Sequence, residues 1–332
     1  MPSTYKRILI IQTAFIGDVI LATGLLEKLH QYFPDSQLSI LVRKGNESLF
    51  EGHPYLHQVI IWDKKKKKYK NLYKVVKGIR KARYDLIINL QRFASTGFIT
   101  AFSSAKYTIG FHKNPLAFTF SKKILHSFQE GWHEIERNQA LIAHLTDQAA
   151  SKPRLYPTLA DKKAVKYYLT SPYICIAPTS VWFTKQWPVE KWVALLNQLP
   201  VHYQVYLLGA PSDRDACDQI IEKSTRANVT NLAGQLTLLQ SAALMAQATM
   251  NYVNDSAPMH LASAMDAPTC AVYCSTIPQF GFYPLATQAH VVETPTHLAC
   301  RPCGIHGHTA CPEGHFQCAQ QIQLQQLLAV LP

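Results

Sequence analysis

The residues best suited to chemistry stand where a β-prone stretch meets a helix, at Asn254-Asp255-Ser256-Ala257-Pro258-Met259-His260. Asp255 and Ser256 are residue types that cap helices, and Pro258 is tolerated in a first helical turn. His260 falls in that turn, so free backbone N–H groups, a carboxylate, a hydroxyl and an imidazole come together. Such a junction can hold an anionic ligand. An ordinary capped helix start explains the same residues equally well.

Similar polar loops follow other predicted strands in this half of the chain. In the segment 178–188, the hydroxyls of Thr179 and Ser180 and the charge of Lys185 could hold phosphate oxygens. Asp213 follows Gly209 at the next strand end, where a carboxylate could reach ribose hydroxyls. In the segment 231–238, a glycine permits a turn and Leu236 could pack against a base. Each loop alone is explained by capping or solvation, but together they predict a nucleotide site.

The first predicted strand of the chain ends in Gln12-Thr13-Ala14-Phe15-Ile16-Gly17-Asp18. In an open parallel sheet this carboxyl end faces the ligand crevice. Gly17 permits a tight turn, and Asp18 stands at the mouth of the next helix, where it could face a ligand or simply cap the helix. The loop has no G-x-G-x-x-G pattern, which weakens a nicotinamide or flavin site, and we expect no cofactor.

Alternating strand and helix patterns must position these loops. Near-continuous apolar strands separated by helices predict parallel sheets covered on both faces, an α/β class, and a length of 332 residues suggests about two domains. We therefore predict two Rossmann-like domains facing a central cleft, residues 1–155 and 156–316, with a helix in 317–332 that could pack back across the boundary. The predicted strands are Arg7–Gln12, Gln37–Val42, Gln58–Trp62, Asp85–Leu90, Tyr173–Ala177, Gln204–Leu208, Met250–Val253 and Thr269–Tyr273. The predicted helices include Val19–Phe33, Tyr69–Ala82, Val189–Leu199, Asp213–Ser224, Leu238–Ala246 and Gln317–Leu331.

The positive charge lies almost entirely in the first half. Residues 1–150 hold 22 Lys and Arg against 11 Asp and Glu, whereas residues 151–332 hold 11 against 10. Much of the excess falls in the segment 64–83, which suggests a polyanionic partner. Nucleic acid, anionic lipid headgroups and phosphorylated glycans fit this charge, and so does an ordinary solvated helix face.

The cysteines fall into two groups. Cys175, Cys217, Cys270 and Cys274 stand in apolar surroundings and are expected in the core. Cys300, Cys303, Cys311 and Cys318 cluster with histidines at a spacing that could ligate zinc or simply pack as free thiols.

Hydropathy and the amino terminus bear on location. No apolar run approaches the ~18 residues of a membrane span, and the run after Arg7 is too soon broken by Gln12 and Thr13 to be a signal peptide. We therefore expect a cytoplasmic protein.

The order and spacing of these motifs resemble glycosyltransferase family nine, the ADP-heptose:lipopolysaccharide heptosyltransferases, over about residues 5 to 330. The motifs are Gly17-Asp18, Lys185-x-Trp187-Pro188, Gly209-x-x-x-Asp213, Gly234-x-x-Thr237-Leu238 and Asn254-Asp255-Ser256-x-x-Met259-His260. The segment 300–318, which contains the four clustered cysteines and is named here the cysteine segment, resembles that of heptosyltransferase II-type members.

The resemblance implies a GT-B fold, with the acceptor domain first and the nucleotide-sugar domain second. It implies inverting heptose transfer without a bound metal, with Asp18 as general base and Thr13 and Gly17 in the acceptor-side loop. Lys185 would assist by stabilising the leaving ADP. The donor would lie against Thr179, Ser180, Lys185, Asp213, Leu236, Asp255, Ser256, Ala257 and His260. Ala257 departs from the family pattern, because glycine usually follows the Asp-Ser/Thr pair.

On this interpretation the favoured acceptor is the heptosyl-Kdo2-lipid A inner core of lipopolysaccharide. The basic stretch 64–83 would draw the protein to this acceptor and to the anionic inner membrane, which makes it a peripheral membrane protein with no nucleic-acid partner. Addition onto Kdo, as in heptosyltransferase I, and a GT-B-like nucleotide-sugar epimerase are the alternatives.

Overall fold

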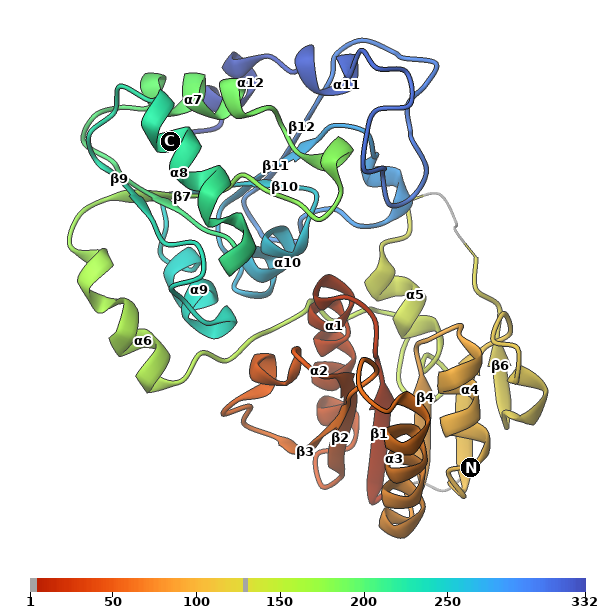
Figure 1. Ribbon diagram of the computed structural model, residues 1–332. Coiled ribbons are helices and arrows are strands. Elements are labelled where there is room, and N and C mark those ends of the chain that lie inside the picture. The colour runs from red at the N-terminus through yellow and green to blue at the C-terminus, as the bar shows by residue number, and fades with distance from the viewer. Residues whose placement is uncertain (1–4, 128–130) are drawn as a thin grey trace. The chain divides into compact units, whose positions relative to one another are not determined.

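The computed structural model describes residues 5–127 and 131–332 of the chain, which divides into two compact units, Met1–Tyr156 and Pro157–Pro332. Residues 1–4, which begin the amino-terminal stretch expected not to be a signal peptide, lie outside the described residues. Each unit contains one twisted parallel sheet with helices on its faces (Figure 1). The predicted α/β class with two Rossmann-like domains is confirmed, and the cleft between them stays a prediction.

In the described part of the first unit, six strands pair in the order β3-β2-β1-β4-β5-β6, all of them parallel. The apolar faces of β1, β2 and β4 are completely buried, as expected for strands covered on both sides. The strands are β1 (Arg7–Ile11), β2 (Gln37–Arg43), β3 (Leu56–Trp62), β4 (Leu86–Asn89), β5 (Tyr107–Phe111) and β6 (Lys122–Ile124). The helices are α1 (Ile16–Leu21), α2 (Thr23–Tyr32), α3 (Lys68–Ala82), α4 (Ala94–Ala101) and α5 (Glu134–Ala140), with short 3-10 turns η1 (Glu47–Phe50) and η2 (Ala117–Thr119).

The described second unit repeats this arrangement with strand order β12-β11-β10-β7-β8-β9, again all parallel. The strands are β7 (Tyr173–Ala177), β8 (Gln204–Leu207), β9 (Val229–Asn231), β10 (Met250–Asn254), β11 (Thr269–Tyr273) and β12 (Ala289–Glu293). The helices are α6 (Leu159–Val165), α7 (Val189–Gln198), α8 (Arg214–Lys223), α9 (Leu238–Met245), α10 (Ala257–Ala264), α11 (Gln317–Gln320) and α12 (Leu324–Leu328), with 3-10 turns η3 (Lys166–Leu169), η4 (Phe183–Lys185), η5 (Pro211–Asp213) and η6 (Pro278–Phe280).

Two helix predictions were wrong in their boundaries. The helix expected over Val19–Phe33 begins earlier, at Ile16, and is interrupted at Ala22, where the Thr23 hydroxyl donates to the Ile20 carbonyl at 2.6 Å. The single helix expected over Gln317–Leu331 is two short helices, α11 and α12. Ile322, between the two helices, is completely buried in the core of the second unit. The helix is therefore interrupted at a residue whose side chain packs in this core.

Four strands were not predicted from the sequence. β6 and β9 are only three residues long, and β12 is largely exposed, so none carries an apolar run. β5 contains Gly110, a residue that weakens a strand pattern. The ring of Phe120 occupies the space that a Cβ at this glycine would need, 2.5 Å away.

Candidate functional site

The second unit places its polar loops at the reversal point of the strand order. β7 and β10 pair in the centre of the sheet, and the chain moves outward from them in opposite directions. Ligands of open parallel sheets bind at the carboxyl ends of such strands. The loop after β7 carries Lys185, and the loop after β10 carries Asp255, so the two strongest candidate residues follow the two strands at this point.

Lys185 and Asp255 form an ion pair at this point. The Lys185 Nζ lies 2.7 Å from the Asp255 Oδ2, and the side chains are only 14% and 8% exposed. The Thr276 hydroxyl, which follows β11, donates to the same carboxylate oxygen at 2.7 Å. The site therefore holds a largely buried lysine whose charge is balanced by one carboxylate. An ammonium has three N–H donors, so this lysine can also donate to an oxygen of a ligand.

His260 lies beside this pair in the first turn of α10. It is 5% exposed, and burial, followed by the nearby charge of Lys185, lowers the pKa of its imidazole to about 3. The ring is therefore neutral near pH 7, and its Nδ1 has no hydrogen-bond partner among the described residues. A neutral imidazole with a free nitrogen can bind a ligand oxygen by hydrogen bonding, but it cannot supply a second positive charge.

The junction between β10 and α10 has the form predicted from the sequence. Ser256 is the N-cap residue, Ala257 begins the helix, and Pro258 stands in the first turn. The Ser256 hydroxyl donates to the Asn254 carbonyl at 3.3 Å and caps no N–H of the helix. The first N–H groups of α10 are therefore not occupied by a side-chain cap.

Asn254 joins the loop after β7 to this junction. Its Oδ1 accepts from the Trp187 backbone N–H at 3.0 Å, and its Nδ2 donates to the Pro178 carbonyl at 2.7 Å. Within the loop, the Gln186 side chain donates to the Ser180 carbonyl at 2.7 Å. These bonds hold the segment that contains Thr179 and Ser180, both half-buried, in a fixed course from the end of β7 to η4.

Asp213 and Leu236 lie at the ends of β8 and β9, farther along the same sheet edge. One oxygen of Asp213 accepts from the Ala210 backbone N–H at 2.7 Å and closes the turn η5, so the residue has at least a capping role. Gly234 has a φ of +74°, and a Cβ at this position would lie 2.7 Å from the Pro211 Cα, which leaves no room for a side chain. Leu236 is half-buried in the following turn. The ribose and base contacts of Asp213 and Leu236 stay predictions.

The cysteine segment lies against the loop that carries Lys185. The Thr184 backbone N–H donates to the His308 carbonyl at 3.1 Å, and the His308 N–H donates to the Thr184 hydroxyl at 2.8 Å. Gly307 has a φ of +76° and sits so close that a Cβ would lie 2.8 Å from the Thr184 hydroxyl. The Ser275 hydroxyl also donates to Thr184, at 3.0 Å. The segment thus fixes the residue before Lys185.

None of the eight cysteines, all of which the structure describes, forms a disulfide. The four expected in the core are buried there, and burial raises the pKa of the Cys175 and Cys270 thiols, the latter to about 12. Burial, followed by the neighbouring cysteines, likewise raises the pKa of the Cys318 thiol to about 11. Over residues 5–127 and 131–332, no three His, Cys, Asp or Glu side chains are arranged to hold a metal ion.

The first unit has its reversal point between β1 and β4, and Asp18 lies in the first turn of α1, which follows β1. Burial raises the pKa of the Asp18 carboxyl above its ordinary value. The backbone N–H groups of Asp18 and Phe15 and the charges of Arg92 and Arg43 act in the opposite direction. A carboxylate with a raised pKa is a better general base than a solvated one. Phe15, and not Asp18, is the N-cap residue of α1.

Thr13 is tied to a lysine from the basic stretch. The Lys64 Nζ donates to both the carbonyl and the hydroxyl of Thr13, each at 2.9 Å, and lies 4.8 Å from the centre of the Trp62 ring. Burial, Arg43 and Lys68 lower the pKa of Lys64 to about 8. Gly17, half-buried, precedes Asp18 in the first turn of α1. The acceptor-side loop therefore lies among several cations.

Comparison with known proteins gives these sites a family context. The profile of glycosyltransferase family 9 (heptosyltransferase) matches residues 72–310, well over half of the chain. The chain belongs to glycosyltransferase family 9. It is therefore a glycosyltransferase, and the family resemblance seen in its motifs is confirmed.

Individual relatives are distant in sequence and near in fold. Lipopolysaccharide heptosyltransferase 3 of Escherichia coli is 27% identical over 278 residues, covering 79% of this chain and 82% of the relative. A family 9 glycosyltransferase structure from Veillonella parvula superposes with a TM-score of 0.88 at 22% identity, covering 99% and 97% of the two chains. Escherichia coli ADP-heptose heptosyltransferase II gives 0.79 at 23% identity, covering 98% of each chain. The fold is GT-B, as in these heptosyltransferases.

Sequence reasoning missed several residues that contact or act on the candidate site residues. Ser275 and Thr276 come one residue after the end of β11, so the strand-end pattern used for the other loops could have found them. Lys64 was grouped with the basic stretch as a whole, because nothing in its local sequence distinguishes it from the four lysines after it. Arg43 ends β2 and Arg92 follows β4, and both act on Asp18 only through the tertiary fold.

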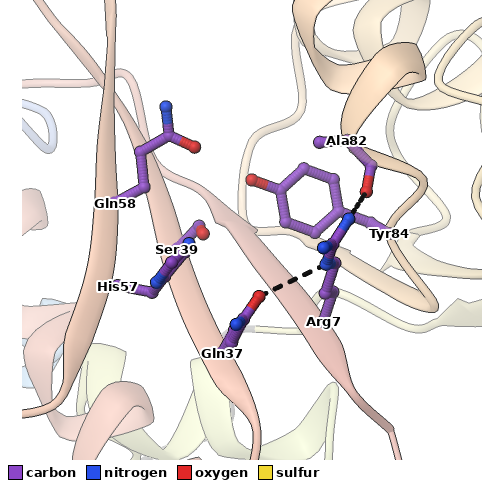
Figure 2. Close-up of a pocket in the computed structure, with 7 residues that line it drawn as sticks. All are labelled: Arg7, Gln37, Ser39, His57, Gln58, Ala82 and Tyr84. Carbon is purple, nitrogen blue, oxygen red and sulfur yellow. Dashed lines mark hydrogen bonds between the residues drawn. The ribbon is translucent and has the colours of Figure 1, made fainter.

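A cavity of about 140 Å³ also occurs in the first unit, at the amino ends of its strands (Figure 2). The guanidinium of Arg7 at this cavity already donates to the Ala82 carbonyl at 2.6 Å and to the Gln37 side chain at 3.2 Å. The cavity lies at the opposite end of β1 from Asp18, and none of the predicted site residues lines it. We therefore do not assign it to the family 9 site.

Proposed function

We propose that this family 9 glycosyltransferase moves L-glycero-D-manno-heptose from ADP-heptose to the lipopolysaccharide inner core, adding the second heptose to heptosyl-Kdo2-lipid A. The observation that carries the proposal is the buried group of Lys185, Asp255 and His260 at the reversal point of the second sheet. The similarity of the cysteine segment to type II enzymes favours the second addition.

The reaction would be a single in-line displacement. The acceptor hydroxyl oxygen forms the new bond to the anomeric carbon while the bond from that carbon to the diphosphate oxygen breaks, so the configuration inverts. Asp18 takes the hydroxyl proton, and its raised pKa favours that role. ADP leaves with the electron pair of the broken bond, and Lys185 and the first N–H groups of α10 stabilise its negative charge.

The remaining predicted donor residues would orient the nucleotide sugar. Thr179, Ser180, Ser256 and Ala257 lie where backbone and hydroxyl groups could hold the diphosphate and sugar, and Asp213 and Leu236 would contact the adenosine. His260, neutral by its lowered pKa, would accept from or donate to an oxygen of the donor and would not act as the base. We propose that neither a cofactor nor a metal takes part.

The basic stretch 64–83 supports a location at the cytoplasmic face of the inner membrane. Anionic lipid A phosphates, Kdo and anionic phospholipids would all be attracted by its eleven lysines and arginines. The structure has no helix long and apolar enough to cross a bilayer in its described residues. We propose peripheral association through charge.

A first-heptose transfer onto Kdo is the second candidate. Its supporting observation is that relatives of types 1 and 2, from Pseudomonas aeruginosa and Escherichia coli, are both 24% identical to this chain. Incubation with ADP-heptose and either Kdo2-lipid A or heptosyl-Kdo2-lipid A, followed by mass spectrometry of the product, separates the two. We expect transfer only to the heptosylated acceptor. A product on Kdo2-lipid A alone would overturn the type II assignment, and failure with both would overturn the acceptor class.

A further inference from the structure

The first unit exposes several phenylalanines around one helix. Phe98 and Phe102 stand one turn apart at α4, with ring centroids 4.4 Å apart, Phe93 caps its amino end, and Phe118 lies on the adjoining turn η2. These four side chains, named here the aromatic patch, are between 39% and 78% exposed. Phenylalanine has no polar group to justify exposure, and grouped exposed apolar side chains mark interaction surfaces.

The packing beneath the aromatic patch holds it in place. Ile99, on the inner side of α4, is completely buried in the core that also contains Val75 and Ile79 of α3. Gly97 of α4 lies so close to the segment before η2 that a Cβ would meet the Asn114 side chain at 2.2 Å. Asn114 in turn donates to the Phe93 carbonyl at 3.1 Å. The phenylalanines therefore project from a rigid support and are not a consequence of a loosely packed helix.

The neighbouring helix is basic along its outer face. α3 contacts α4, and the two lie side by side on the same face of the sheet (Figure 1). Between Asp63 and Asp85 the chain has no acidic residue. Tyr69 and Tyr73, one helical turn apart among the lysines of α3, are 80% and 66% exposed. Tyrosine is enriched where one end of a side chain meets lipid and the other meets water.

We propose that the aromatic patch inserts into the headgroup and upper acyl region of a bilayer containing anionic phospholipid, while α3 lies along its surface. Stable membrane association needs two signals, and here an apolar one and a polybasic one stand on adjacent helices. A duplex nucleic acid would use the charge but leave the phenylalanines in water, since its bases are stacked on one another. The inference rests on the proposed function in that a lipid-anchored acceptor requires the enzyme to work at a bilayer.

The position of the patch suits an enzyme with such an acceptor. Phe93 directly precedes α4, in the loop after β4, and this is the carboxyl edge of the sheet that also carries Asp18. The surface that would meet the bilayer therefore begins at the edge where the acceptor hydroxyl is expected. Charge alone would attract the protein to the membrane, and the aromatic patch would set which side of the first unit faces it.

Co-sedimentation of the full-length protein with vesicles tests this inference. The vesicles contain phosphatidylethanolamine and phosphatidylglycerol in a 3:1 ratio, or phosphatidylcholine alone. For the anionic vesicles we expect the F98S/F102S variant to bind roughly 10- to 100-fold more weakly, the loss expected for two part-buried phenylalanine rings. K70E/K74E should also bind more weakly, and mainly at low salt. The matched control Y167S/V201S removes two exposed apolar side chains from the second unit and should bind like the wild type.

Salt separates the two signals. In 0.5 M NaCl the wild type should retain weak binding to anionic vesicles, and F98S/F102S should retain none that is measurable. Unchanged vesicle affinity in F98S/F102S, with the fold verified by circular dichroism, would overturn the inference. The inference would also be wrong if the wild type were a dimer and F98S/F102S a monomer in analytical ultracentrifugation while both bound vesicles equally well. The aromatic patch would then join two copies of the chain.

A separate measurement keeps this inference distinct from the proposed function. Vesicle binding is read without donor or acceptor, so it can succeed even if heptose transfer fails. Transfer to a deacylated, water-soluble acceptor should be the same for F98S/F102S and the wild type, because neither phenylalanine lies in the loops that carry Asp18 or Lys185. Reduced transfer to the soluble acceptor would show that the phenylalanines act within the active site, which contradicts a membrane role.

Discussion

The ion pair between Lys185 and Asp255 provides the sharpest test of the second-unit site. Replacement of Lys185 by Met removes the cation 2.7 Å from a carboxylate whose side chain is 8% exposed. Breaking a buried pair on one side typically costs about 3–5 kcal/mol, because the remaining charge loses its partner. For a unit of this size, 1 kcal/mol shifts the melting temperature by about 2–4 °C, so K185M should melt roughly 6–20 °C lower.

The same substitution should weaken nucleotide binding for a different reason. A charge-assisted hydrogen bond contributes about 1.5–3 kcal/mol, so ADP affinity measured by calorimetry should fall roughly 10- to 100-fold. The two effects separate in the double variant K185M/D255N, which leaves no unpaired charge. That variant should recover most of the melting temperature and none of the ADP affinity. K163M, which removes an exposed lysine of α6, is the control for net charge and should change neither quantity.

Specific outcomes would refute this reasoning. If the double variant melted as low as K185M, the loss would come from packing of the lysine stem and not from the unpaired carboxylate. If K185M bound ADP within twofold of the wild type, Lys185 would not contact the diphosphate. Full ADP affinity in the double variant would lead to the same conclusion.

The remaining predictions concern the base, two titrating groups and metal dependence. D18N should keep donor binding and lose about 10²- to 10⁴-fold in kcat, and near-normal turnover would exclude Asp18 as the base. Because the pKa of Lys64 is about 8, the KM for acceptor should rise above that pH, and K64R should abolish the rise; an identical pH profile in K64R would exclude the role. His260 has a folded-state pKa of about 3, so below pH 6.5 the unfolded chain binds a proton that the folded chain does not, and the free energy of unfolding should fall with acidification. At pH 5 the loss amounts to about 2 kcal/mol. Denaturant titrations at a series of pH values should show that the free energy of unfolding of H260Q depends less steeply on pH than that of the wild type. Incubation with EDTA should leave heptose transfer unchanged; loss of activity restored by one added metal would contradict the metal-free proposal.

The strand-end loops were predictable because their signals are local. An apolar strand followed by capping residues and a helix shows itself in a few neighbouring positions, as at Asn254–His260. The junction between β10 and α10 accordingly has the expected N-cap and first turn. Which loops meet depends on strand order, and the alternation of strands with helices implies the usual reversal at the first and fourth strands. That reversal brings the loops of Lys185 and Asp255 together.

The contacts that come from distant segments were not predictable. No local pattern indicates that Lys64 turns inward to Thr13 while its neighbouring lysines face solvent. The exposed phenylalanines at α4 also escaped notice, because no helix was predicted over residues 94–101 and an apolar residue is ordinarily assigned to the core. The burial of Ile99 and the 39% exposure of Phe98 show that the two side chains face opposite ways.

The contact between His308 and Thr184 has a consequence for the order in which the two units can fold during synthesis. Residues more than a hundred positions apart must meet before the loop that carries Lys185 is held in place. In the same unit, the Tyr252 hydroxyl of the central strand β10 donates to the Leu327 carbonyl at 2.9 Å. Chains fold as they leave the ribosome, beginning with the amino-terminal domain. The first unit can therefore be complete while the candidate site of the second unit is not, because residues 307 to 327 have yet to emerge.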